Sequence, residues 1–198
     1  MKTVELNDDN LTLNDISKFE HKGRAILMHG DMILVASYGG VFLLPGGKVD
    51  EDKNESSKLA LIRELKEETG VNYTLDELTQ VLNLKWFQSN YPTRSKDVIN
   101  RYLETDYFIA DFKGIDLNNV HRTEKELKDG FSLKLISIEE FTKTLSVGSD
   151  NPRKKFFDKE NEIVIDTIRS IRESRGRKWL NYLIKKWMRL SLVFLIIN

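Results

Sequence analysis

The sequence predicts an α/β fold, in which helices cover a β-sheet. Two observations support this prediction: apolar runs of strand length are separated by turn residues, and a few helix-like segments interrupt them. Strands interleaved with a few helices are typical of α/β layers rather than of a helical bundle. The 198 residues contain no internal repeat and are enough for one domain with a sizeable core and an appendage.

The hydrophobic pattern places each expected element along the chain. In chain order, these are two strands within residues 24–37, a strand over 41–44, a helix over 56–69, strands over 80–89, 102–112 and 133–138, and helices over 138–145 and 158–173. The turn-rich triplet His29-Gly30-Asp31 joins the first two strands. The third strand ends at Pro45-Gly46-Gly47, where glycine permits a tight turn and a close approach of the backbone.

Capping residues mark the ends of two expected helices. Ser56 or Ser57 is expected to cap the N-terminus of the first helix, and Gly70 is expected to end it in the left-handed conformation. Ser137 is the expected N-cap of the helix over residues 138–145. The first of these helices is therefore well delimited by its sequence.

That helix, over residues 56–69, also carries a cluster of acids. Glu64, Glu67 and Glu68 stand at positions i, i+3 and i+4, so their carboxylates project from one face. Two carboxylates about 5 Å apart repel each other by roughly 3 kcal/mol at an effective dielectric constant of about 20. A divalent cation would turn this repulsion into attraction, and Mg²⁺ prefers oxygen ligands. A solvated acidic surface is the alternative that the three acids alone leave open.

The flanking residues resemble the Nudix box, a motif with the pattern G-x5-E-x7-R-E-U-x-E-E-x-G-U, where U is apolar. The matching residues are Gly47, Glu55, Arg63, Glu64, Leu65, Glu67, Glu68, Gly70 and Val71. Seven residues rather than five separate Gly47 from Glu55, and strict spacing would put Lys53 in the place of the first glutamate. A lysine cannot accept hydrogen bonds there. We therefore interpret residues 48–54 as a loop about two residues longer, because loops absorb length at little cost.

The resemblance implies the fold and domain organisation of the Nudix family. It covers roughly residues 22–174 and implies an α/β/α sandwich around a mixed β-sheet. Residues 1–21 are then a polar N-terminal lead-in, and residues 175–198 are a C-terminal tail that the family pattern does not require.

The resemblance also implies an activity: hydrolysis of a diphosphate bond in a nucleoside diphosphate linked to another group. Water attacks a phosphorus atom, and the implied cofactor is Mg²⁺ or Mn²⁺. By resemblance, the metal ligands are Glu64, Glu67, Glu68 and the carbonyl group of Gly47. Arg63 and Glu55 are implied to orient the site, because arginine can donate a bidentate pair to a carboxylate. An ordinary surface pair between Arg63 and Glu67 is the alternative.

The general base is the least defined part of the implied site. In this family it is usually one more acid outside the box, and its position varies. The candidates here are Glu124, Glu126 and Asp129, in the segment before the strand over 133–138, with Glu126 or Asp129 preferred. The alternatives are that this segment is a solvated charged loop, or that Glu67 or Glu68 serves as the base itself.

Substrate recognition is assigned to residues 85–101, which mix aromatic and basic side chains. The proposed contacts are Tyr91, Arg94 and Arg101, because an aromatic ring can stack on a base and a cation can bind phosphate. Trp86 and Phe87 are further stacking candidates, and the alternative for all the aromatic residues is core packing. The three histidines, His21, His29 and His121, share no ligand spacing and are assigned no metal.

Charge divides the chain unevenly. Residues 175–198 hold six basic residues and no acidic one, so the remainder carries a net charge of −6 because the whole chain is neutral. An acidic body argues against general nucleic-acid binding. The tail combines a basic amphipathic helix with about eight apolar residues, fewer than the ~20 needed to span a bilayer. It is expected to pack on the body or on a second subunit of a homodimer, to lie on an anionic membrane surface, or to extend freely.

Composition and motif together favour a cytoplasmic hydrolase acting on a small-molecule nucleotide derivative. The chain has no cysteine, which excludes disulfides and thiolate chemistry and fits a reducing compartment. Residues 1–10 are polar, so no secretory signal is expected. The alternatives are a nucleotide-sensing module without turnover and a non-hydrolytic enzyme of the same fold, such as an isomerase. The sequence does not identify the nucleotide.

Overall fold

The computed structural model describes residues 1–38, 40–93, 95, 97–121 and 130–174. The chain divides into two compact units, Met1–Asn161 and Glu162–Asn198. The candidate site described below lies entirely in the first unit. Of the second unit, residues 162–174 are described and are helical.

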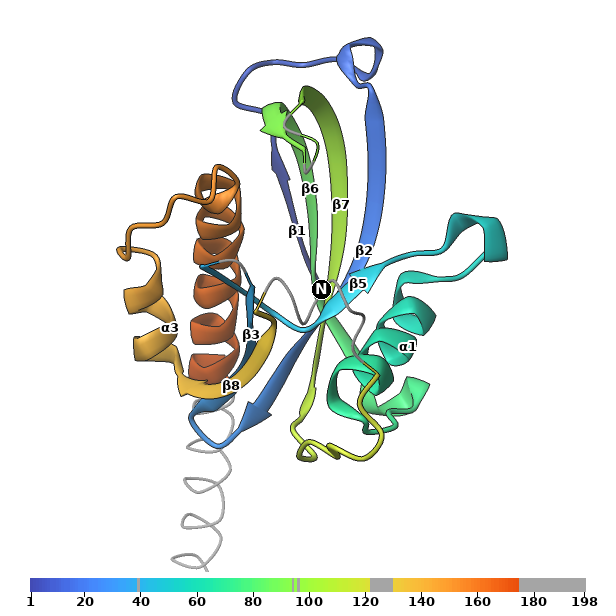
Figure 1. Ribbon diagram of the computed structural model, residues 1–198, viewed down its shortest axis with the longest axis vertical. Helices are drawn as coiled ribbons and strands as arrows, with labels where there is room; N and C mark the ends of the chain where they lie inside the picture. Colours follow the sequence, from blue (N-terminus) through green and yellow to red (C-terminus); the bar gives the residue numbers. More distant parts are fainter. Residues whose placement is uncertain (39, 94, 96, 122–129, 175–198) are drawn as a thin grey trace, which may run out of the picture. The chain divides into compact units, whose positions relative to one another are not determined.

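The first unit is built on a mixed β-sheet (Figure 1). Its strands are β1 (Lys2–Leu6), β2 (Lys18–His29), β3 (Met32–Tyr38), β4 (Val41–Leu43), β5 (Gly46–Lys48), β6 (Thr79–Pro92), β7 (Val98–Asp111) and β8 (Ser132–Ser137). Its helices are α1 (Ser57–Thr69) and α3 (Ile138–Thr144), with short 3-10 turns at Leu13–Asp15, Glu51–Lys53 and Leu75–Glu77; residues 154–161 begin the helix that continues to residue 174.

The strands run in the order β1-β6-β7-β2-β3-β4, with β5 paired to β2 and β8 paired to β3. The β1–β6 and β2–β7 pairs are parallel, and the other pairs are antiparallel. The predicted fold class, a mixed sheet covered by helices, is confirmed.

Each face of the sheet has its own apolar cluster. On one face, Leu61 and Leu65 of α1 pack against Ala25, Leu27 and Phe108 of the sheet. On the other face, Trp86 and Tyr91 pack against Phe156, at ring-centroid distances of 5.8 and 5.0 Å. The α1 cluster holds the helix that carries the acids, so hydrophobic packing fixes where those acids lie.

The local signals in the sequence placed several elements correctly. Ser56 caps α1 by accepting a hydrogen bond from the Leu59 N–H at 3.3 Å, and Gly70 ends the helix with φ of 74°. Ser137 caps α3 by accepting from the Glu140 N–H. The β2–β3 turn falls at Gly30, whose φ is 58°.

Three features differ from the expected pattern. Residues 2–6 of the polar lead-in form the strand β1, which pairs with β6. The strand β2 begins at Lys18, before the first apolar run, and the glycine turn after residue 45 becomes the strand β5. In each case a neighbouring strand supplies the backbone hydrogen bonds, so the segment joins the sheet without an apolar pattern of its own.

No helix in the described part of the chain is long and apolar enough to cross a membrane. The expectations for the tail, residues 175–198, concern a segment outside the described residues, as does the expectation for Arg94.

Candidate active site

Three backbone segments meet closely where α1 lies on the sheet. The strand β5 pairs with residues Lys22 to Arg24 of β2, and Gly46 has a φ of +126°. A Cβ atom at Gly46 would lie 2.3 Å from the Gly23 carbonyl oxygen, and one at Gly23 would lie 2.2 Å from the Ser57 carbonyl oxygen. Glycine is therefore needed at both positions, because any side chain would push the backbones apart.

This close approach sets two of the box glutamates against β5. The Gly46 N–H donates a hydrogen bond to Glu68 Oε2 at 3.0 Å. A Cβ atom at Gly47 would lie 2.2 Å from the carboxylate carbon of Glu64. The carboxylates of Glu64 and Glu68 therefore both lie beside the Gly46–Gly47 backbone.

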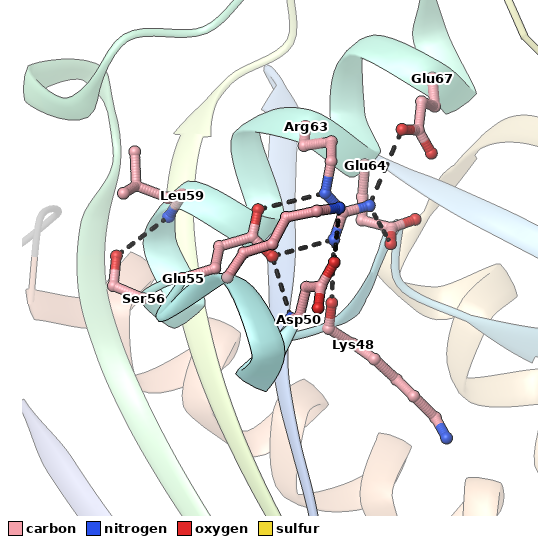
Figure 2. Close-up of polar contacts among 9 residues, drawn as sticks. Lys48, Asp50, Glu55, Ser56, Leu59, Arg63, Glu64 and Glu67 are labelled. Carbon is pink, nitrogen blue, oxygen red and sulfur yellow. Dashed lines mark hydrogen bonds and ion pairs between the residues drawn. The ribbon is translucent and has the colours of Figure 1, made fainter.

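Arg63 joins the helix to the loop before it (Figure 2). Its Nε and one terminal nitrogen donate to the two oxygens of Glu55, each at 3.1 Å, which is a bidentate pair. Its other terminal nitrogen lies 2.8 Å from Glu64 Oε1 and 3.7 Å from Glu67 Oε1. Hydrogen bonding to Arg63 lowers the pKa of Glu55, so this carboxylate stays ionised.

The loop before α1 agrees with the insertion inferred from the sequence. Lys53 pairs with Asp50 at 2.6 Å, whereas Glu55 accepts from both Arg63 and the Asp50 N–H. Asn54 turns the chain in the left-handed conformation, with a φ of 50°. Glu55, rather than Lys53, therefore stands opposite the arginine.

The donor chemistry at Gly46–Gly47 suits a hard divalent cation. Mg²⁺ takes oxygen ligands and usually keeps several water molecules, so one or two carboxylates suffice. Glu67 is farther out: its side chain is 45% exposed, and its carboxylate lies 3.7 Å from Arg63. Within the described ranges, no group of three or more acidic, histidine or cysteine side chains is arranged to hold a metal ion. The described residues thus offer Glu64 and Glu68 as a pair of carboxylate ligands, with Glu67 apart from them.

A pocket of about 690 Å³ opens beside these two carboxylates. Its walls include Gly46, Gly47, Glu64 and Glu68 on the side of the box. Its described basic lining residues are Lys18, Lys22, Arg24, Lys48, Arg101 and Arg153. The pocket has the size of a site for a small organic ligand, and its lining favours an anionic one.

Glu20 connects most of these cations. Its carboxylate lies 3.0 Å from Lys18, 3.5 Å from Lys22, 2.5 Å from Lys48 and 2.7 Å from Arg101. Burial alone would raise the pKa of Glu20, but the surrounding cations outweigh burial and hold it well below its usual range. Glu20 is therefore a fixed negative charge and is unsuited to act as a general base.

Two predicted substrate residues come together in this pocket. The Arg101 guanidinium lies 3.3 Å from the centre of the Tyr91 ring, and both residues line the cavity. Trp86 packs on Phe156 in the core, while Phe87 packs edge-on against Tyr102 at 4.9 Å. The base candidates Glu124, Glu126 and Asp129 lie outside the described residues, so their placement stays a prediction.

Sequence reasoning missed the basic lining contributed by β2. Lys18, Glu20, Lys22 and Arg24 alternate along the strand, and alternate residues share one face of a sheet. This charged alternation, directly before an apolar run, was the available signal. Lys18 and Glu20 fall in the polar lead-in over residues 1–21, and an alternation of charged residues without apolar partners does not by itself predict a strand.

On the opposite face of the sheet, Asp106 ties α1 to three strands. Its carboxylate accepts from Ser57 at 2.6 Å, from Gln80 at 2.6 Å and from Asn83 at 2.8 Å, and it lies 2.9 Å from His21 Nε2. The hydrogen bond to Asp106 raises the pKa of His21. This network fixes the start of α1, and with it the position of the acids about two to three turns farther along.

This chain is similar to known proteins in sequence and in fold. The family model of the NUDIX domain matches residues 19–158. A NUDIX hydrolase from Nitrosomonas europaea is similar in structure, with a TM-score of 0.50, 16% identity, and coverage of 73% of this chain and 88% of that one. The E. coli ORF135 protein has a TM-score of 0.48 and 22% identity, with coverage of 83% of this chain and 97% of that one. No curated protein sequence matches this chain.

Proposed function

We propose, from the premise that this chain belongs to the NUDIX domain family, that it hydrolyses a diphosphate bond in a nucleoside diphosphate linked to another group. The proposal includes a requirement for Mg²⁺ or Mn²⁺ and attack by water on phosphorus. One observation carries it: Glu64 and Glu68 lie beside the Gly46–Gly47 backbone at the wall of a pocket lined with cations.

In this proposal, Glu64 and Glu68 hold the cation together with the backbone of Gly47. The bound cation would supply Lewis-acid activation of the phosphate and a nucleophilic water. Arg63 and Glu55 act as positioning residues, because their bidentate pair limits the rotamers of Arg63, which in turn contacts Glu64 at 2.8 Å. Glu67 is proposed as a further ligand that turns inward when the cation binds, and Glu126 or Asp129 as the base.

The cations of the pocket bind the charged substrate. Arg101, stacked on Tyr91 and paired with Glu20, is held in one orientation before any ligand arrives. Such pre-ordered donors bind phosphate oxygens without paying the entropy of fixing a long side chain. Tyr91 acts here as a support for Arg101 and is itself buried.

The test is product release from a panel of nucleoside diphosphate derivatives, with Mg²⁺ or with a chelator. Glu68→Gln is expected to lower kcat by at least 100-fold while leaving the circular dichroism spectrum unchanged. Glu140→Gln, an exposed change on α3, is the matched control and is expected to retain full activity. Turnover by Glu68→Gln at the wild-type rate would contradict the proposal.

A nucleotide-binding module without turnover is the second candidate. It is favoured by one observation, the distance of Glu67 from a grouped set of ligands within the described residues. The same panel separates the two functions: a sensing module binds a nucleotide in calorimetry and releases no product with either metal.

A further inference from the structure

We infer that the pocket contains a second anion subsite, formed by Lys22, Arg24 and Arg153, which receives a phosphate monoester on the substrate in addition to the diphosphate that is cleaved. This inference rests on the proposed function and names the class of substrate for that site. It is carried by the placement, burial and charge of the pocket lining.

The subsite is built by pairing two distant strands. Lys22 and Arg24 lie on the same face of β2, and in the parallel register they pair with Thr105 and Tyr107 of β7. Lys18 pairs with Arg101 in the same register, so the basic residues of both strands share one face. Arg153 joins them from the segment that precedes the helical residues 154–161.

These cations are buried, which is costly unless negative charge lies nearby. Arg24 is 6% exposed, and the Lys22 side chain is 12% exposed. Arg24 lies 3.7 Å from Glu160, which also accepts a hydrogen bond from Tyr107. Lys22 lies 3.5 Å from Glu20, a carboxylate that it shares with three other cations.

The lining therefore has more positive than negative charge. Its described residues include six basic side chains against the three carboxylates of Glu20, Glu64 and Glu68. Two of those carboxylates are assigned to the catalytic cation, which leaves Glu20 in the lining, and Glu160 beside Arg24, as the acids that face the basic residues. An anionic ligand would offset this surplus and so would bind more tightly than a neutral one.

Two further observations favour the binding of an anion beside Lys22 and Arg24. The Nε atom of Arg24 is buried and makes no hydrogen bond within the described residues, although it lies 3.7 Å from Glu160 Oε1, and the Nη1 atom donates to the Leu44 carbonyl oxygen. Burial, together with the nearby Arg101 and Arg24, lowers the pKa of Lys22 to about 7. A phosphate beside Lys22 would restore its charge, because an opposite charge favours the protonated form.

The surplus of positive charge in the pocket lining is large enough to favour a phosphate monoester over a second phosphate diester. A diphosphate that links two groups carries two negative charges. Because the charge of the divalent cation is already balanced by Glu64 and Glu68, the diphosphate is offset by the six basic residues, whose other described partners are Glu20 and Glu160, and about two positive charges remain. A phosphate monoester adds about 1.5 to 2 further negative charges at neutral pH. The pocket, at about 690 Å³, has room for more than the diphosphate alone.

The experiment measures binding without metal, so that it does not depend on turnover. Matched pairs that differ by one monoester are titrated in calorimetry with a chelator present: coenzyme A against dephospho-coenzyme A, NADP against NAD, and a nucleoside triphosphate against its γ-methyl ester. We expect the phosphorylated member of at least one pair to bind at least 10-fold more tightly.

Variants locate the subsite. Lys22→Gln and Arg153→Gln are each expected to reduce that ratio to 3-fold or less, with melting temperatures that show a folded protein. Lys134→Gln removes an exposed charge from β8, outside the pocket, and is expected to leave the ratio unchanged. A ratio near one for all three pairs in the wild-type protein would overturn the inference, as would a preserved ratio in both Lys22→Gln and Arg153→Gln.

The experiment distinguishes failure of the proposed subsite from failure of the proposed hydrolase function. If the monoester preference is present but no compound is hydrolysed with Mg²⁺ or Mn²⁺, the subsite stands and the hydrolase proposal fails. If hydrolysis occurs without a preference in any pair, the hydrolase proposal stands and the subsite fails.

Discussion

The two faces of the sheet around β2 handle buried charge in opposite ways. On the α1 face, Asp106 is one acid surrounded by neutral donors and a single histidine. On the pocket face, Glu20 is one acid surrounded by four described cations. The Asp106 carboxylate finds its hydrogen-bond partners within the protein and holds the start of α1 in place. The second arrangement has more basic than acidic groups, so the comparison separates a structural network from a proposed binding surface.

The largest loss of folding stability is expected from neutralising Glu20, the acid of the pocket face. Glu20→Gln leaves Arg101 and Lys22 buried beside an uncharged group, and breaking a buried ion pair in this way costs about 3–5 kcal/mol. Urea unfolding should show this loss of stability, and added inorganic phosphate should restore part of it by occupying the cationic pocket. An equal loss with and without phosphate would contradict the distinction between the two faces.

The next largest loss of folding stability is expected from a substitution at Gly23, where α1 contacts β2. In Gly23→Ala, the new Cβ would lie 2.2 Å from the Ser57 carbonyl oxygen, so the helix must move. Overpacking of this kind costs about 1–3 kcal/mol, and it also displaces the acids of α1. Gly148→Ala is the control, because a Cβ there meets nothing within 4 Å. Thermal unfolding of the two variants measures the difference.

A smaller effect is expected from the acid of the α1 face. Asp106→Asn keeps one acceptor oxygen but loses the ionic character of the contact with His21, which should cost about 1–2 kcal/mol. Unlike the loss in Glu20→Gln, this loss should not respond to phosphate. Partial rescue of Asp106→Asn by phosphate would show that the two networks are coupled.

The smallest effect is the pH dependence of stability that His21 contributes on the α1 face. Asp106 raises the pKa of His21 above 6.5 in the folded protein, so the folded state favours the protonated imidazole. The resulting stabilisation is complete below the unfolded pKa and is lost as pH rises through the folded pKa. Because His21 is partly exposed, we expect only a few tenths of a kcal/mol. The difference between wild type and His21→Gln should shrink from pH 5.5 to pH 8, and a constant difference would contradict this account.

Much of the geometry around the box glutamates was predictable. The Nudix box, the caps of α1 and the longer loop before Glu55 are all local features. Arg63 and Glu55 are eight residues apart and meet through a single turn, so their contact follows from spacing once the helix is placed. Tyr91 and Arg101 were also named from sequence, and in the structure both line the pocket, with the Arg101 guanidinium over the buried Tyr91 ring. Their contact with a substrate stays a prediction.

The sequence by itself determined the acidic helix, its ends and its neighbouring turn, because capping and i, i+4 spacing act within a few residues. Only the tertiary structure decided that Glu64 and Glu68 face β5 while Glu67 lies apart, and that Lys22 and Arg24 line the same cavity. The physical reason is that parallel pairing joins β2 to β7 across about 80 residues, and no local pattern encodes the partner of a strand. Pairing with β7 places the alternating charged residues of β2 in the wall of the pocket, on the same face as Arg101.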